Sequence, residues 1–321
     1  MWRFILSRVG FGILVLFLLS VFVFFLFYVS PSDPARIIAG NKATEALMAQ
    51  IRTTLGLDQP IYVQYWRFIS NLFQGNLGFS YRSNLPVTQI IASRIPVTLS
   101  LVIGSVLIWL GIGIPIGIAS ARNPGSLRDR AGQSFALLGI SFPTFVLGML
   151  SLYVLYFLPT KAGVTLFPPS GYVPITQDPL SWAWHLILPW MTLALVSAAV
   201  YARLTRGQML EVLGEDYIRT AWAKGLTERR VVYRHAFRSA MPPLVTQLGT
   251  DIGMLLGGVI VIEQVFGLLG LGSLAVTSVN QQDRPVVIGV VLLGGLFVVV
   301  CNVIVDTLYA LMDSRIRTAA R

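Results

Sequence analysis

Residues 95–121 read IPVTLSLVIGSVLIWLGIGIPIGIASA and contain no Asp, Glu, Lys or Arg. A helix of about 20 residues crosses a ~30 Å hydrocarbon core, so this stretch is long enough to span a membrane. Five other stretches qualify once Asp251 is allowed inside one of them: Val9–Val29, Ala131–Thr160, Pro179–Ala202, Ser239–Ile262 and Pro285–Val305. The sequence therefore predicts an all-α membrane protein with six transmembrane helices.

The overall composition agrees with this class. Of the 321 residues, 55% are hydrophobic and 12% are charged, whereas about a quarter of the residues in a soluble domain are charged. Six spans use most of the chain and leave no room for a large soluble domain. The single cysteine, Cys301, lies inside the sixth span, so a disulfide framework is excluded.

The distribution of basic residues predicts the orientation of the chain. There are 24 Lys and Arg against 14 Asp and Glu, a net charge of +10. Sixteen of the basic residues precede span one, follow span six, or lie between spans two and three or four and five. Short loops rich in Lys and Arg stay inside, which predicts that both termini are cytoplasmic. The orientation of the chain in membrane lipid therefore accounts for its excess of positive charge. No nucleic-acid partner is expected.

The first span begins like a signal peptide, because Arg3 and Arg8 precede an apolar run. That run is too long for a signal peptide, and no small-residue cleavage site follows it. Residues 1–30 are therefore predicted to be a retained N-terminal membrane anchor helix.

The segment 31–94 separates the first two spans and is predicted to be an extracytoplasmic helical insertion. Apolar residues recur at helical spacing from Leu47 to Leu55 and again from Tyr62 to Phe73, with Gly56 and Pro60 between the two stretches. We expect two amphipathic helices that cap the outer ends of the spans, with their aromatic residues at the membrane interface. The alternative is a surface that helps to dock an external partner.

The cytoplasmic loop 203–238 carries twelve charged residues. Helix-forming residues run up to Gly225, which can end a helix in the left-handed conformation, and Thr227 can cap the next helix. Ala221, Ala223 and Gly225 leave little side-chain bulk, which suits close approach by the backbone of another protein. The alternative is a basic loop that only obeys the topology rule.

Several motifs follow one another along almost the whole chain. Within the loop they are Asp216-Tyr-Ile-Arg-Thr-Ala-Trp-Ala-Lys-Gly-Leu226, Arg234-His-Ala-Phe-Arg238 and Pro242; elsewhere they are Gly56-Leu-Asp-Gln-Pro60, Gly75-Asn-Leu-Gly78, Arg94-Ile-Pro-Val-Thr-Leu99, Ser141-Phe-Pro-Thr-Phe145, Glu263-Gln-Val-Phe-Gly267, Gly270-Leu-Gly272 and Tyr309-Ala-Leu-Met-Asp313. In order and spacing the chain resembles the permeases of type I ABC importers, specifically the dipeptide, oligopeptide and nickel branch.

The resemblance implies the type I ABC-importer transmembrane fold. It divides the chain into the anchor, the insertion, a five-helix permease core at 95–312 and a cytoplasmic tail at 313–321. The loop would form a coupling helix that docks on an ATPase through Asp216, Arg219, Thr220, Ala221, Lys224, Gly225 and Leu226. Arg219, Thr220 and Ala221 stand at the three EAA positions of the family motif. Arg replaces Glu at the first of these, and Leu269 and Ser314 replace two prolines that are usual in the branch.

The resemblance also implies the partners: a homologous second permease, two ATPase subunits or domains and an extracytoplasmic substrate-binding protein, in a bacterial inner membrane. The chain is not expected to be an enzyme, because none of its three lysines follows the glycine that a Walker A loop requires. No cofactor is expected on this chain, since ATP and Mg²⁺ would bind the partner ATPases. No metal site is expected, because His185 and His235 fall on opposite sides of the predicted membrane.

The implied solute is a short peptide, with nickel and glutathione as alternatives within the branch. A rival class is an ion-coupled secondary transporter or channel, which would use an intramembrane carboxylate. Asp251 is predicted near mid-membrane and is a candidate for the pathway or for a contact between permeases. Glu263 is a second candidate, although it and Asp306 are expected to reach water or lipid headgroups.

Small residues and prolines give further expectations for the spans. Gly113 and Gly117, and likewise Gly253 and Gly257, have the spacing that lets helix backbones approach each other. Prolines inside three spans are expected to kink them, at Pro115, Pro143 and Pro189.

Overall fold

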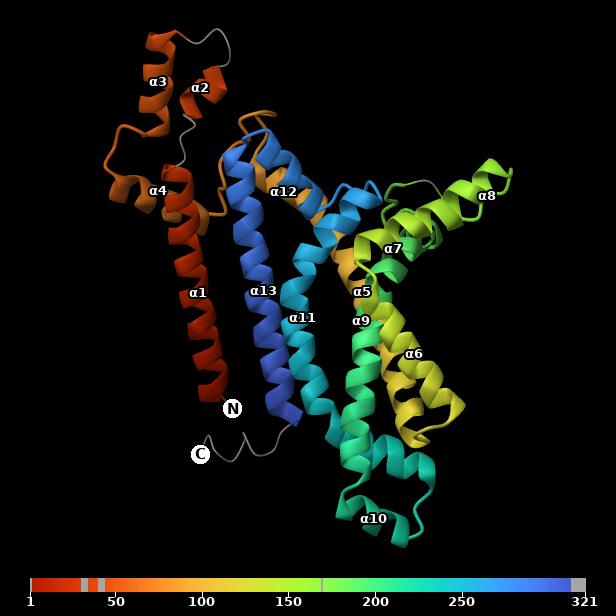
Figure 1. Cartoon of the computed structure of the whole chain (residues 1–321). Coiled ribbons are helices and arrows are strands. Elements are labelled where there is room, and N and C mark those ends of the chain that lie inside the picture. Colours follow the sequence, from red (N-terminus) through yellow and green to blue (C-terminus); the bar gives the residue numbers. More distant parts are fainter. Residues whose placement is uncertain (1, 30–33, 40–43, 169, 313–321) are drawn as a thin grey trace.

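The computed structural model describes residues 2–29, 34–39, 44–168 and 170–312 and is built from helices joined by short connections (Figure 1). The α-helices are α1 (Trp2–Val29), α2 (Pro34–Ala39), α3 (Glu45–Leu55), α4 (Ile61–Phe73), α5 (Val87–Arg122), α6 (Leu127–Ser141), α7 (Thr144–Ser151), α8 (Leu158–Lys161), α9 (Pro179–Leu213), α10 (Asp216–Ala223), α11 (Phe237–Val265), α12 (Leu271–Asn280) and α13 (Arg284–Met312). Among the described residues, the π-helical segments Leu152–Phe157 and Arg230–Ala236 precede α8 and α11.

Within the part of the chain that the structure describes, five helices are long and apolar enough to cross a membrane: Ile5–Phe27, Val87–Arg122, Thr144–Lys161, Pro179–Leu213 and Arg284–Leu308. A sixth span is formed if the helical pieces Arg230–Leu255 and Gly257–Val265, which meet at 52°, are taken together. The prediction of an all-helical membrane protein with six spans is confirmed on this count.

The third span differs from the prediction. The apolar run 131–160 is not one helix, because α6 ends at Ser141 and a new helix, α7, starts at Thr144. Phe142 has the extended backbone that a residue before proline favours, and Pro143 occupies the N-cap position of α7. Pro143 therefore separates two helices, whereas Pro115 and Pro189 lie within the continuous helices α5 and α9. In Figure 1, α7 and α8 lead away from the direction of α6.

The core of the bundle lies between α5, α9 and α11. The α5 and α9 backbones approach closely because Gly113 and Gly117 face α9: a Cβ atom on Gly113 would lie 2.6 Å from the Ala198 carbonyl oxygen. The expected close approach is confirmed for this pair of glycines. It is not found for Gly253 and Gly257, since Gly257 has no neighbouring atom within 4 Å of an added Cβ.

The insertion contains the two amphipathic helices that the sequence predicts, α3 and α4. Gly56 ends α3 with φ +67°, and Pro60 stands at the N-cap of α4. The structure adds the short helix α2 and an isolated bridge between Phe79 and Pro86. Helix α5 starts at Val87, eight residues before the predicted start of the second span.

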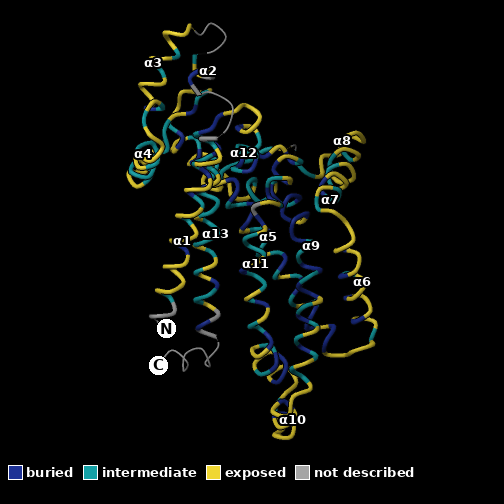
Figure 2. The backbone as a smooth tube through the Cα atoms, turned by 60° about the vertical axis from the view of Figure 1, so that its left-hand side comes forward, coloured by how far each residue is buried: buried dark blue, intermediate teal, exposed yellow. Residues whose placement is uncertain are grey.

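The bundle has two distinct ends (Figure 1). The end that carries α10 also holds the start of α1 and the end of α13, where Arg8 Nε lies 3.2 Å from Asp306 Oδ2. We call it the α10 end and call the opposite end, which carries α12 and the insertion, the α12 end. Figure 2 shows that exposed residues dominate α10 and much of α1, while buried residues concentrate along α9 and its neighbours.

Candidate docking site

Helix α10 is a short, well-delimited helix at the tip of the α10 end. Glu215 has an extended backbone before the first helical residue. At the other end Gly225 adopts φ +72° and its N–H donates to the Trp222 carbonyl oxygen at 2.9 Å. The left-handed glycine that the sequence predicts as a helix stop is confirmed. The Thr227 carbonyl oxygen accepts bonds from the N–H groups of Arg230 and Val231, so Thr227 stands at the start of the following helix, as expected.

One face of α10 points into the protein. Ile218 is fully buried and Ala221 is 8% exposed. The Ala221 methyl group therefore packs inward, and its part in docking a partner stays a prediction. The outward face consists of the residues opposite these two, namely Asp216, Arg219, Thr220 and Ala223.

The outward face carries polar groups that engage each other only weakly. Arg219 Nη1 lies 3.3 Å from Asp216 Oδ1, and both side chains are largely exposed. The Thr220 hydroxyl donates to the Asp216 carbonyl oxygen at 3.0 Å. Exposed ion pairs of this kind contribute little to stability, so these groups can be given up to a partner at small cost. Lys224 and Gly225 continue the exposed surface beyond the helix.

Two large aromatic side chains flank the outward face of α10, and the sequence did not lead us to expect a role for them. Tyr217 is 45% exposed and Trp222 is 44% exposed. Partly exposed aromatics are the residues that most often anchor protein interfaces. Their place on either side of the buried positions 218 and 221 was readable from the helical period, since α10 was already expected to be a helix.

The base of α10 is an apolar cluster that joins four segments. Leu226 packs against this cluster from the turn after the helix. Its buried members come from the ends of α5 and α9, from α10 and from the start of the α11 segment: Ile118, Ala121, Met209, Ile218, Ala221, Val231, Val232, Ala236 and Ala240. The cluster therefore connects α10 to α5, to α9 and to the segment that leads into α11.

An ion pair adds a polar connection between the loop and α5. Arg122, the last residue of α5, donates from Nε to Glu228 Oε1 at 2.8 Å. Glu228 begins the helix that follows Gly225. The segment after α10 is thus fastened to α5 directly as well as through the apolar cluster.

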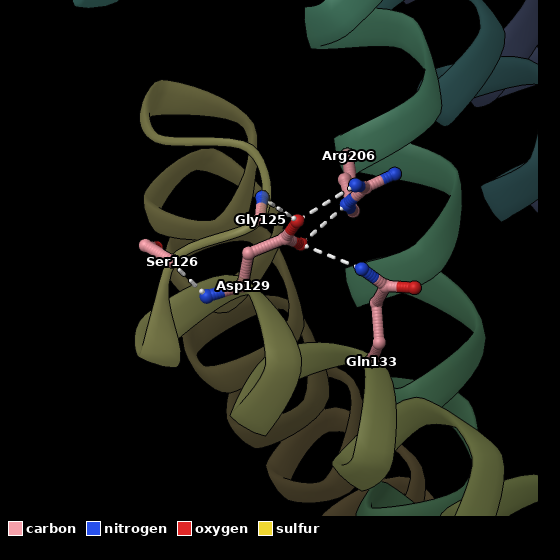
Figure 3. A network of polar contacts seen from close by, with 5 residues as sticks. All are labelled: Gly125, Ser126, Asp129, Gln133 and Arg206. Carbon is pink, nitrogen blue, oxygen red and sulfur yellow. Dashed lines mark hydrogen bonds and ion pairs between the residues drawn. The ribbon is translucent and has the colours of Figure 1, made fainter.

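A second and more deeply buried ion pair joins α6 to α9 at the same end (Figure 3). Arg206 donates from Nε to Asp129 Oδ1 at 2.6 Å and from Nη2 to Oδ2 at 2.9 Å. The Gly125 N–H and the Gln133 side-chain amide also donate to this carboxylate, at 2.8 and 3.0 Å. Asp129 is 1% exposed, so the protein covers its carboxylate almost completely.

The Arg206 guanidinium, helped by the Gly125 N–H, holds the pKa of the Asp129 carboxyl well below its ordinary value. The pair therefore stays ionised at neutral pH. Sequence reasoning missed this pair. The sequence does signal the start of α6, because Ser126 accepts from the Asp129 N–H at 3.3 Å and a serine three residues before an acid is a known helix start, but this signal does not point to Arg206.

A cavity of about 660 Å³ lies beside this ion pair, between α5, α6 and α9. Its polar lining residues are Ser120, Gln133, Ser134, Ser141, Arg203 and Arg206. Hydroxyl, amide and guanidinium groups can all hydrogen-bond a polar solute.

The predicted intramembrane acids have different surroundings. Asp251 is half-buried, accepts a bond from the Gln247 amide at 2.8 Å and lies near the buried Tyr201 hydroxyl. That hydroxyl has no partner of good hydrogen-bond geometry among the residues described. The expectation that Glu263 reaches water or headgroups is wrong, because Glu263 is 0% exposed. Its carboxylate accepts from the Thr98 hydroxyl at 2.6 Å and from the Ser273 N–H at 2.8 Å.

Comparison with solved structures identifies the fold. The chain is similar to a chain of the structure titled "Inward facing conformations of the MetNI methionine ABC transporter", with a TM-score of 0.55 and 18% sequence identity. The likeness covers 70% of this chain and 97% of that one. It shows the fold of a type I ABC-importer permease, as predicted.

Comparison with protein sequences identifies the family. A protein of Brucella abortus named as a peptide transport system permease is 43% identical over 315 residues, with 98% of each chain covered. The glutathione transport system permease protein GsiC of Salmonella paratyphi A is 44% identical over 317 residues, with 99% of each chain covered. Residues 1–102 match the N-terminal model of the family, and residues 113–318 match its main model. The chain belongs to the family of binding-protein-dependent transport system inner membrane components and is an ABC-importer permease.

Proposed function

We propose that this chain is one half of the membrane pathway of an ATP-driven importer and that α10 is its coupling helix. The second half is a homologous permease, two ATPase subunits or domains dock at the α10 end, and a substrate-binding protein delivers the solute at the α12 end. ATP and Mg²⁺ bind to the ATPases. In this arrangement the α10 end and both termini are cytoplasmic, which agrees with the excess of basic residues there.

The observation that carries this proposal is the contrast between the two faces of α10. Asp216 and Arg219 are exposed and weakly engaged, while Ile218 and Ala221 are locked into the cluster that unites α5, α9 and α11. A partner bound to the outer face of α10 would therefore also move the inner face and the cluster packed against it. The Arg122–Glu228 ion pair passes the same displacement to α5. ATP-driven closure of the partners would thus rotate the bundle and open the path outward, and hydrolysis would reset it.

We propose a short peptide as the solute. Relatives that match nearly the whole chain carry peptide or glutathione in their names, and glutathione is itself a tripeptide. The cavity between α5, α6 and α9 has a partly apolar lining, and its hydroxyl, amide and guanidinium groups suit backbone amides and carboxylates. Asp251 is the better candidate of the two intramembrane acids for the pathway, because the Glu263 carboxylate is turned inward.

A rival function is ion-coupled transport through Asp251, favoured by the buried hydroxyl of Tyr201 beside it. Such a carrier would take up solute without an ATPase, and Asp251→Asn would abolish uptake. If the chain is part of an ATP-driven importer, the Asp251→Asn variant still takes up solute, and this uptake does not depend on ion gradients. Solute movement in vesicles that contain this chain alone would overturn the importer.

The decisive experiment uses two glycines in matched conformations. Gly225 and Gly75 both have φ +72°, and neither has an atom within 4 Å of an added Cβ. A tryptophan at either position therefore meets the same backbone strain, and its Cβ has open space, but only Gly225 lies beside α10. We expect Gly225→Trp to reduce the ATPase that co-purifies in mild detergent, or its stimulation by solute, by about tenfold, a loss of about 1.4 kcal/mol. Gly75→Trp should change neither. Equal behaviour of the two variants would contradict the docking role.

A further inference from the structure

Helix α4 in the insertion has three different faces. On the first face Tyr65 and Phe68 pack on Phe24 of α1, with ring centroids 5.3 and 5.7 Å away, and the Tyr65 hydroxyl lies 3.0 Å from the Ser20 hydroxyl. This face fixes α4 against α1. Figure 1 shows α4 crossing α1 near the outer end of α1.

The second face is an exposed apolar stripe about a quarter-turn from the first, given 3.6 residues per turn. Tyr62 is 72% exposed, Trp66 is 73% exposed and Phe73 is 88% exposed. With the half-buried Ile69 they follow the spacing i, i+4, i+7 and i+11, so they form one continuous stripe. Water is a poor environment for three large aromatic side chains on a single helix face.

The third face is polar and lies opposite the stripe, with Gln64, Arg67, Asn71 and Gln74. The Gln64 side-chain amide donates to the carbonyl oxygens of Leu57 and Gln59, in the connection from α3. In both Figure 1 and Figure 2 this connection and α3 lie on the side of α4 away from the α10 end. The apolar stripe, being opposite, faces back toward the α10 end and thus toward the membrane.

The depth of α4 follows from its contacts with α1. Ser20 and Phe24 lie seven and three residues before Phe27, where the apolar span of α1 ends. At 1.5 Å per residue α4 is about 5 to 10 Å below that end. This is the depth at which amphipathic helices lie in the boundary between headgroups and acyl chains. Apolar side chains of α1 at this depth are exposed as well, since Phe22 and Phe25 are 64% and 58% exposed.

We propose that α4 lies in the outer interface of the bilayer and inserts its Tyr62–Trp66–Phe73 stripe among lipid acyl chains. Lipid fits this surface better than a soluble binding protein, which would have to reach below the end of the α1 span to touch it. Trp and Tyr are the residues that prefer this interface. The insertion would then hold α1 at a fixed depth and orientation. This inference does not depend on the solute or on the role of α10.

The single cysteine of the chain makes a direct test practical. In a Cys301→Ala background, Trp66→Cys and the matched polar-face variant Asn71→Cys carry a nitroxide label in vesicles of phosphatidylethanolamine and phosphatidylglycerol. We expect the label at 66 to collide with oxygen and to be shielded from a water-soluble nickel chelate, at a depth of about 5 to 10 Å. The label at 71 should show the reverse.

Tyr62→Cys repeats the measurement at a second stripe position, in case the loss of Trp66 alters the fold. Equal exposure of positions 62 and 71 to the nickel chelate overturns the proposal. Shielding of position 62 that occurs only after a soluble binding protein is added also overturns it, and assigns the stripe to that partner.

Discussion

Each end of the bundle contains a buried carboxylate, and the two carboxylates are stabilised by different kinds of partner. At the α10 end Asp129 meets the full positive charge of Arg206. At the α12 end Glu263 accepts bonds from the uncharged Thr98 hydroxyl and Ser273 N–H. An acid paired with a guanidinium loses most when one partner is removed, because a charge is left behind. An acid held by neutral donors loses individual hydrogen bonds.

The space around the two acids differs as well. A Cβ on Gly270 would lie 2.1 Å from Glu263 Oε1, so the turn into α12 is closed tightly on that carboxylate. Asp129 instead borders the 660 Å³ cavity through Gln133 and Arg206. The turn at the α12 end is thus packed tightly on its carboxylate, while at the α10 end open space lies beside the ion pair.

The largest effect should come from Asp129→Asn. The substitution leaves Arg206, whose side chain is 25% exposed, without its counter-charge, and breaking such a pair costs about 3 kcal/mol or more. We expect a clear drop in the apparent Tm of the detergent-solubilised protein. The exposed control Asp216→Asn should leave the Tm unchanged. If Asp129→Asn behaves like the control, the ion pair does not hold α6 to α9.

The same pair makes a prediction about pH. Because the pKa of Asp129 is lower in the folded chain than its ordinary value near 3.9, the stabilisation is complete above about pH 4 and is lost only as the pH falls further, through the folded pKa. The difference in Tm between the wild type and Asp129→Asn should therefore be constant from pH 8 to about pH 5. A difference that already shrinks near pH 6 would contradict this assignment.

At the other end, Glu263→Gln should have an intermediate effect. The amide places an NH₂ group against a donor, either Thr98 or Ser273, and a buried donor left without an acceptor costs about 1 to 3 kcal/mol. Thr98→Val in the same chain should make the second substitution cheaper, because the two groups share one bond. Additive changes in Tm would show that the bond contributes nothing.

The sequence was sufficient for features that depend on neighbouring residues and insufficient for those that depend on distant ones. Local signals were sufficient for Gly225 and Gly56, since each ends a helix through its own backbone conformation. They were also sufficient for Gly113, because its spacing with Gly117 favours close helix contact. Pairings between distant segments were out of reach: Asp129 and Arg206 are 77 positions apart, and Glu263 and Thr98 are 165 apart. Their burial depends on how the spans pack, which hydropathy does not encode.

The smallest effect should come from Arg122→Gln, which removes the exposed connection between α5 and Glu228. The two side chains are 34% and 52% exposed, and such a pair contributes about 1 kcal/mol or less and is screened by salt. The matched control is Arg128→Gln, which removes the same charge from an exposed position at the same end. We expect Arg122→Gln to lower the Tm slightly more than the control at low salt, and equally at high salt. A loss as large as that of Asp129→Asn would mean that the polar connection, and not the apolar cluster beneath α10, joins the loop to the bundle.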